Sequence, residues 1–200
     1  MLKDILSLDF YYPLSLLFLI LSFLSFFLKA EKRINYLSFL LIFLIFTFLF
    51  YSFLLSVLQY LIWKNNNFSK LLLPPYTPIS YFLNYALFNF FRDFIFRLFG
   101  FLLTFAFLYI IFFTLKRDPF YDDEKYFILI SSLLFSFPYN FFFIFISFFI
   151  LLLMATFATF LKKENGYYSF RFFWPFLSLV LLILEIPLYK KFFFLIQIKP

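Results

Sequence analysis

The chain has 200 residues, of which 66% are hydrophobic and 14% are charged; 43 are phenylalanine, and the formal net charge is +7. A soluble domain of this length needs more polar surface than this composition supplies, so we expect an integral membrane protein whose first partner is the lipid bilayer. Cysteine and histidine are absent, which excludes disulfides, thiol and imidazole catalysis and nearly all zinc and haem sites, and we expect no cofactor and no metal.

The positive charge does not indicate binding of nucleic acid. The basic residues are scattered among the segments between apolar runs and form no stripe with interleaved stacking aromatics, so anchoring at the membrane interface explains them better. No small-residue cleavage site follows the first apolar run, which favours a retained span over a signal peptide. We expect one membrane domain over residues 1–200, in the inner (cytoplasmic) membrane of a prokaryotic cell.

Runs without a charged residue locate the helices, because a helix that crosses the hydrocarbon needs about 20 residues. The run 126–161 is too long for one span, and Pro138 and Asn140 favour a break within it. The predicted fold class is therefore all-α, a polytopic transmembrane bundle of about seven helices. Their expected ranges are 12–28, 36–63, 74–91, 95–115, 120–137, 139–161 and 172–189.

Seven alternating spans predict which charged residues share a side of the membrane. They put Lys64, Lys125 and Arg171 on one side, and Arg33 and Arg97 on the other. Basic residues are almost evenly divided between the two sides, so the positive-inside rule leaves the orientation open. The two glycines of the sequence are too few for helix association through Gly-rich seams, and we expect packing through phenylalanine, leucine and tyrosine.

The stretch KRDPFYDDEKYF, at 116–127, holds four of the ten acidic residues. Asp118 followed by Pro119 is typical of a helix start, which places Asp122, Asp123 and Glu124 near the positive end of the helix dipole. A solvated, well-capped helix boundary explains this stretch when it is taken alone. A carboxylate at a lipid–water boundary is also suited to general acid–base catalysis.

Two further stretches mark helix entries with proline. NNNFSKLLLPPYTPISYFL, at 65–83, is a polar cluster followed by leucines and then by prolines that enter a span. YYSFRFFWPFLSL, at 167–179, has Arg171 as an interface anchor and Pro175 just inside a span, where proline is tolerated. Taken singly, each stretch is explained by a loop and a helix start.

Taken in order, these stretches resemble the membrane aspartic peptidases that cut type IV prepilin leaders. That family has an Asp before a Leu/Ile-Pro-Asn/Asp helix entry, then Gly-x-Gly-Asp-x-Lys at another helix start, then a Pro-Phe-Gly-Pro-Phe-Leu-like entry to a late helix. The second motif would place its Asp on Asp123 and its Lys on Lys125. In the third, Pro175, Phe176 and Leu177 match.

The first motif fits less well. Leu73 and Pro74 match its helix entry, but Asn67 stands where the first catalytic Asp belongs. YYPLSLL near the N-terminus looks like the Tyr-Pro-Leu stretch that opens the family's peptidase half, so the resemblance runs from about residue 12 to residue 179. Both glycines of the second motif are replaced, by Phe120 and Asp122, and the cysteine-bearing cytoplasmic segment of many bacterial members is missing.

What the resemblance implies is a diverged relative. Aspartic proteolysis needs two carboxyl groups around one water, so the catalytic pair would be Asp123 with Asn67, and Asn67 cannot act as an acid or base. Lys125, Pro74 and Pro175 would contact the substrate. We expect an aspartic-type endopeptidase that is inactive or nearly inactive, whose partners would be prepilin-like leader peptides. It would then keep a groove for a hydrophobic helix, as a binding or assembly component of a pilus or secretion apparatus.

The alternative is a small polytopic transporter, or a structural or assembly protein, without peptidase ancestry. Its candidate polar features are Arg92, Asp93 and Arg97 between the third and fourth expected spans, where Asp93 and Arg97 are four apart and would pair on one helix face. A plain interfacial turn is the interpretation we favour for them. Transporters usually show ionisable groups deep within spans or interrupted spans, and neither pattern is evident in the sequence.

Overall fold

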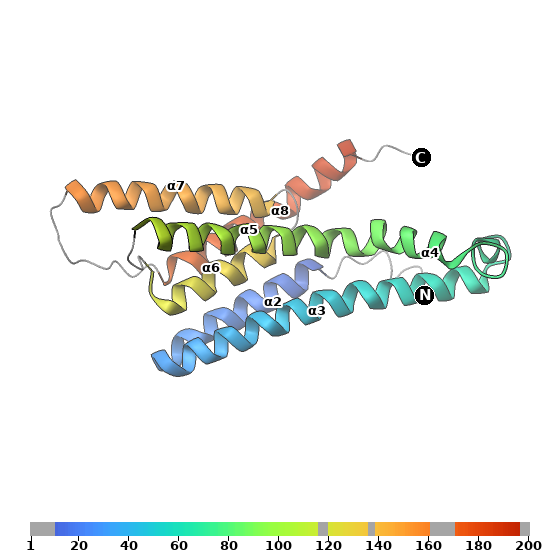
Figure 1. Cartoon of the computed structure of the whole chain (residues 1–200), viewed down its shortest axis with the longest axis horizontal. Helices are drawn as coiled ribbons and strands as arrows, with labels where there is room; N and C mark the ends of the chain where they lie inside the picture. The colour runs from blue at the N-terminus through green and yellow to red at the C-terminus, as the bar shows by residue number, and fades with distance from the viewer. Residues whose placement is uncertain (1–10, 116–119, 136–138, 161–170, 197–200) are drawn as a thin grey trace.

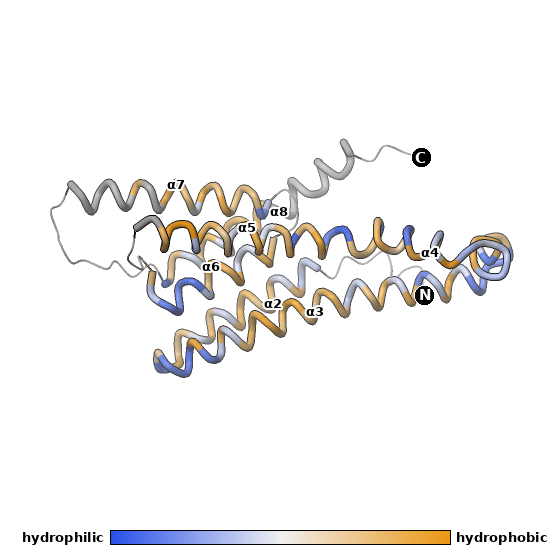
Figure 2. Tube along the Cα trace, viewed as in Figure 1, coloured by the Kyte–Doolittle hydropathy of each residue, from blue (hydrophilic) through white to orange (hydrophobic). Residues whose placement is uncertain are grey.

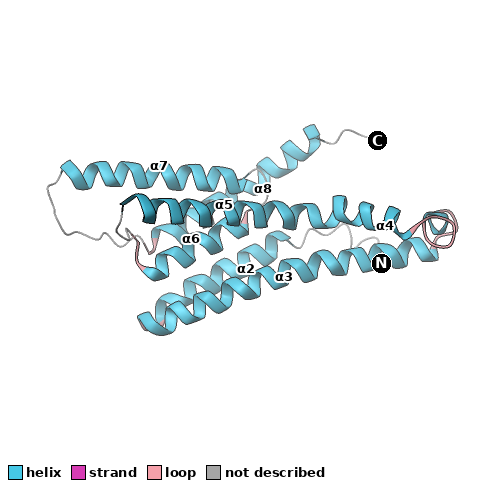
Figure 3. Cartoon of the chain, in the orientation of Figure 1, coloured by secondary structure: helices cyan, strands magenta, loops and turns pink. Residues whose placement is uncertain are grey.

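The computed structural model describes residues 11–115, 120–135, 139–160 and 171–196, and within these ranges every regular element is a helix (Figure 3). The all-α prediction is therefore confirmed. The elements in chain order are α2 (Tyr11–Leu24), η1 (Ser25–Phe27), α3 (Ala30–Asn65), η2 (Ser69–Leu72), α4 (Ile79–Ala86), η3 (Leu87–Phe91), α5 (Arg92–Leu115), α6 (Asp122–Leu134), α7 (Tyr139–Phe160) and α8 (Phe173–Ile196).

The predicted helix boundary between residues 91 and 95 is wrong. α4, the π-helical segment η3 and α5 follow one another without a break, and they form one long rod that runs antiparallel to α3 (Figure 1). The charged residues that suggested a turn are absorbed within the helix, and Arg97 is 3% exposed. This merger means that the described residues do not form seven separate helices.

α6 occupies the middle of the bundle and is short. Its 13 residues cover about 20 Å, which is less than the roughly 30 Å of a bilayer's hydrocarbon core. It contacts α2, α3, α5, α7 and α8, and ten of its side chains are buried. Figure 1 shows α6 running inward from the end of the molecule where α3 begins, and α7 running back towards that end. α6 and α7 thus form a helical hairpin whose inner ends, Leu134 and Tyr139, are buried. The predicted break between 137 and 139 falls at residues outside the described ranges.

The second half of α3 and all of α4 extend beyond the bundle as a two-helix arm, at the right of Figure 1. Residues 66–78 join the two helices at its tip. The arm has a small apolar core of its own, formed by Trp63, Leu73, Phe82 and Ala86. Its polar tip therefore lies far from the end of the bundle where α3 begins.

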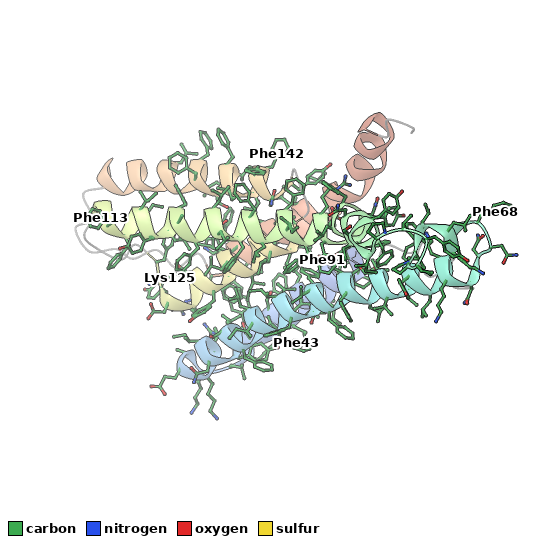
Figure 4. The ribbon with its side chains drawn as sticks, turned by 45° about the vertical axis from the view of Figure 1, so that its right-hand side comes forward. Phe43, Phe68, Phe91, Phe113, Lys125 and Phe142 are labelled. Atoms are coloured by element: carbon green, nitrogen blue, oxygen red, sulfur yellow. The ribbon has the colours of Figure 1, made fainter. Side chains whose placement is uncertain are left out.

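The bundle is apolar outside and partly polar inside. Large hydrophobic side chains are exposed along its helices, and the labelled Phe43, Phe113 and Phe142 point outward in Figure 4. Hydrophilic residues gather mainly at helix ends and in the loop of the arm (Figure 2). The buried polar side chains are Ser15, Ser22, Ser25, Ser52, Ser56, Arg97, Thr104, Asp123, Glu124, Ser131, Ser132, Asn140, Ser147 and Ser178.

Two helices of the described chain, Ala30–Asn65 and Ile79–Phe113, are long and apolar enough to cross a membrane. The remaining apolar stretches found within the described helices are shorter, at Tyr11–Phe27, Tyr139–Ile150 and Phe173–Leu184. The number of membrane crossings therefore stays a prediction.

A single glycine sets the distance between α5 and α7, without a Gly-rich seam of the kind that the sequence excludes. Asn140, at the start of α7, is fully buried, and its Nδ2 donates to the backbone oxygen of Phe96 at 2.8 Å. A Cβ on Gly100 would clash with that Nδ2 and lie 2.9 Å from Cγ and 3.0 Å from Cβ of Asn140. The contact is thus possible only because residue 100 has no side chain.

We expect Gly100→Ala to destabilise the protein by about 1–3 kcal/mol, because the added methyl overpacks the α5–α7 contact and displaces the Asn140 amide. The higher helix propensity of alanine offsets at most about 1 kcal/mol of this loss. Thermal unfolding in detergent measures the effect. Ala106→Leu, on the exposed side of α5, is the matched control and should leave the midpoint nearly unchanged. Equal midpoints for Gly100→Ala and the wild type would contradict the close contact.

Candidate functional site

An ion cluster joins three segments at the end of the bundle where α3 begins. Oδ2 of Asp123, in the first turn of α6, accepts a hydrogen bond from Nη1 of Arg33 at 2.8 Å. Nε of Arg171, just before α8, lies 3.1 Å from the same oxygen, in an ion pair that lacks hydrogen-bond geometry. The Asp123 side chain is 5% exposed, that of Arg33 is 11% exposed and that of Arg171 is 29% exposed. One carboxylate therefore holds two guanidinium groups.

Arg33 also fixes the turn between α2 and α3. Its Nε donates to the backbone oxygen of Ser25 at 3.2 Å, and its Nη2 donates to that of Leu28 at 3.0 Å. These carbonyls belong to η1 and the residues after it, where a chain leaving a helix has unpaired acceptors. Arg33 is thus a cross-link between this turn and the start of α6.

Aromatic rings surround the cluster. The ring of Phe26 stacks on Phe127 of α6, with centroids 4.9 Å apart, and on Phe172 before α8, with centroids 4.3 Å apart. The guanidinium carbon of Arg171 lies 4.4 Å from the centroid of the Tyr121 ring. The stack and the ion cluster bring the same segments together, and each protects the other from solvent.

The start of α6 is close to the predicted helix boundary. Oε2 of Glu124 accepts a hydrogen bond from the backbone N–H of Tyr121 at 3.3 Å, and Nζ of Lys125 pairs with Asp122 at 3.0 Å. Acidic residues in this first turn also suit the dipole. Asp118 and Pro119, the predicted cap, lie outside the described residues. Lys125 therefore takes part in a local helix-start pair, and its predicted contact with a substrate stays a prediction.

The predicted catalytic pair does not come together. Asn67 is exposed at the tip of the arm, after the end of α3, whereas Asp123 contacts Arg33 near the beginning of α3. From Arg33 to Asn65 the helix alone covers about 48 Å. The expectation that Asn67 and Asp123 meet at one edge of the membrane is therefore wrong. The predicted sides of the membrane are wrong for these residues because α4 and α5 form one continuous rod where the sequence predicted two spans. Each segment after α5 therefore lies at the end of the molecule opposite to the predicted one.

The two prolines of the predicted substrate site are also far apart. Pro74 is exposed in the loop of the arm, and the helix it was expected to begin starts at Ile79. Pro175 is buried in the first turn of α8, one residue after the fully buried Trp174. Pro175 thus lies at the same end of the molecule as Asp123, and Pro74 lies with Asn67. The stretches 116–127 and 167–179 are therefore in contact through Asp123 and Arg171, whereas the stretch 65–83 lies in the arm, away from both.

A second polar site lies inside the bundle, around Arg97 of α5. Its Nη1 donates to the backbone oxygen of Leu133 at 3.1 Å and to that of Leu134, at the end of α6. Ser15 of α2 also lies within reach, with its Oγ 3.4 Å from Nη1 and donating to Leu134 O at 2.9 Å. The predicted pair between Asp93 and Arg97 is wrong, because Arg97 turns towards these carbonyls.

Sequence patterns alone predict neither site. The basic charge of Arg33 and Arg171 between apolar runs is typical of interface anchors, and nothing in the spacing of these two residues shows that one carboxylate binds both. Arg97 was placed in a turn because Arg92 and Asp93 stand nearby. Its signal was available in principle, since the run 98–115 is short for a span and extending it backwards would bury Arg97.

No protein-family model matches the chain, and comparison with curated proteins and with solved structures finds no significant match.

Proposed function

We propose that this chain is a polytopic integral membrane protein with a structural or assembly role and without peptidase activity. The observation that carries the proposal is the state of Asp123, which is buried between Arg33 and Arg171 and tied to both. A carboxylate that joins three segments of the bundle in this way serves packing. It is not presented to a peptide bond.

The membrane part of the proposal rests on the distribution of polarity. In the described chain, phenylalanines and leucines cover the outside of the helices, and serines, Asn140 and Arg97 lie within. Lipid is the solvent that such a surface requires, because exposed apolar area of this extent is rare on soluble monomers. The two long apolar helices support the same conclusion.

The kinship with prepilin peptidases stays a prediction, and so do the prokaryotic inner membrane and the leader-peptide partner. One contact supports the kinship: Asp123, in the stretch that resembles the second motif, pairs with Arg171, in the stretch that resembles the third. The distance of Asn67 speaks against it. Glu124, the carboxylate next to Asp123, comes from the same helix and accepts from Tyr121 N, so it does not replace the missing partner.

We expect no leader removal when the protein is expressed in membranes with a prepilin-type substrate, because one carboxylate alone cannot shuttle protons around a water. The assay compares the wild type with Asn67→Asp and with Arg33→Asp, which places a second carboxylate beside Asp123. Asn67→Asp should stay inactive, since residue 67 lies at the tip of the arm. Efficient cutting by the wild type would refute the proposal, and cutting by Arg33→Asp alone would support peptidase ancestry. Immunoblots of the membrane fraction check that all three forms are present.

A further inference from the structure

Arg97 is a buried charged residue beside the midpoint of α3, where the bundle meets the arm. It is 3% exposed, and its guanidinium carbon lies 4.9 Å from the ring centroid of Phe48, which is close to the midpoint of α3. The ring of Tyr11 has its centroid 5.2 Å from the same carbon and 5.6 Å from the centroid of Phe48, so both rings lie on one side of the guanidinium. A guanidinium at this depth is costly in a lipid-solvated protein, and such residues usually mark a functional site.

The hydrogen-bond donors of Arg97 are only partly used. Nη1 donates to the carbonyls of Leu133 and Leu134, which are left without helical partners where α6 ends. Nε is buried and has no acceptor among the described residues. A buried N–H without an acceptor is unfavourable in proteins, so this atom is the natural contact point for a ligand.

The charge of Arg97 is also only partly balanced. Among the described residues, no acidic side chain lies within ion-pair distance of its guanidinium. The end of α6 supplies the negative end of a helix dipole, equivalent to about half an elementary charge. Asp93, one turn earlier on α5, acts electrostatically on Tyr11, as Arg97 does, without pairing with Arg97. Among the described residues, the guanidinium of Arg97 therefore keeps a positive charge that no carboxylate pairs with.

We propose that the Arg97 site binds one small monovalent anion of the halide class, with chloride as the physiological candidate. A single negative charge balances the single guanidinium, and Nε–H supplies the donor. A phosphate or carboxylate fits less well, because its several oxygen atoms would need more donors than the rings of Tyr11 and Phe48 can provide. This inference goes beyond the proposed structural role and does not depend on it.

The test uses the full-length protein purified in detergent. Binding of radioactive chloride should be saturable, and bromide should displace it whereas sulfate and gluconate should not. Replacing gluconate by saturating chloride at constant ionic strength should raise the unfolding midpoint by about 2–4 °C, since a ligand that binds only the folded state stabilises it. Absence of saturable chloride binding by the wild type would overturn the proposal.

Variants locate the site. Arg97→Met should abolish chloride binding, and Arg97→Lys, which keeps the charge but lacks Nε–H, should weaken it at least tenfold. Arg92→Met, an exposed arginine on the same helix, is the matched control and should bind chloride as the wild type does. Asp93→Asn should bind as tightly or more tightly, because a competing negative charge is removed. Binding lost in Arg92→Met and kept in Arg97→Met would place the anion elsewhere and overturn the assignment. If Arg97→Met does not fold, the chloride affinities of Arg97→Lys and Arg92→Met are compared instead. Equal affinities in these two variants would overturn the assignment to Arg97.

Discussion

Replacing Asp123 by asparagine is expected to lower the free energy of unfolding by about 3–5 kcal/mol, because it leaves Arg33 largely buried beside a neutral group. Most of the lost stability should come from the broken pair with Arg33. The pair with Arg171 contributes less, because the Arg171 side chain is 29% exposed and solvent screens its charge. Arg171→Met should accordingly cost about 1 kcal/mol or less. Chemical unfolding in mixed detergent micelles measures all three proteins.

A double-mutant cycle separates the ion pair from the folding of its neighbours. Asp123→Met combined with Arg33→Met removes both charges and should recover much of the stability that Asp123→Met alone loses. Additive losses in the double variant would contradict a direct 2.8 Å pair between these residues. Far-UV circular dichroism of each variant confirms that the helix content is kept.

Replacing Phe127 by alanine is expected to cost about 3 kcal/mol of unfolding free energy, at the low end for a buried phenylalanine. The side chain is 1% exposed and stacks on Phe26, so its removal opens a cavity beside the ion cluster. The loss is at the low end because, for a chain unfolded within lipid, no transfer from water contributes to packing between helices. Thermal unfolding in detergent is the measurement.

Phe172→Ala is the matched control, since Phe172 stacks on the opposite side of Phe26 but is 70% exposed. We expect a change within about 0.5 kcal/mol, as for other exposed substitutions. Equal losses of stability in the two variants would contradict this expectation. They would mean that the exposed ring of Phe172 stabilises this end of the bundle as much as the buried ring of Phe127 does.

The composition and the run lengths of the sequence were enough to predict helices, and most boundaries lie within a few residues of the structure. The error was at residues 92–97, where the local rule that charges end a span conflicts with long-range burial. Carbonyls at the end of α6 compensate Arg97, and they lie in contact with it only after folding. The sequence of α5 alone cannot predict these contacts, because the hydrogen-bond acceptors of Arg97 belong to α6.

The site was predictable only in part, for the same reason. Asp123 was singled out by its place in an acidic helix start, and it is the centre of the ion cluster. The sequence does not predict its partners, because the missed continuity of α4 and α5 places Arg33 on the opposite side of the membrane from Asp123, and Asn67 on the same side, the reverse of what the structure shows. A single error in the number of spans inverts every later loop, whereas an error of a few residues at one boundary changes almost nothing.

The hairpin of α6 and α7 bears on how the chain enters a membrane. Each helix has one end at the side where α3 starts, and their other ends, Leu134 and Tyr139, are buried within the bundle (Figure 1). An insertion machinery would therefore leave the acidic start of α6 and Arg171 on the same side of the membrane, and the hairpin would slide between α3 and α5 after these had integrated. Biogenesis of the central helix would then be a late step, driven by the match between the unpaired carbonyls at its tip and an arginine already in place.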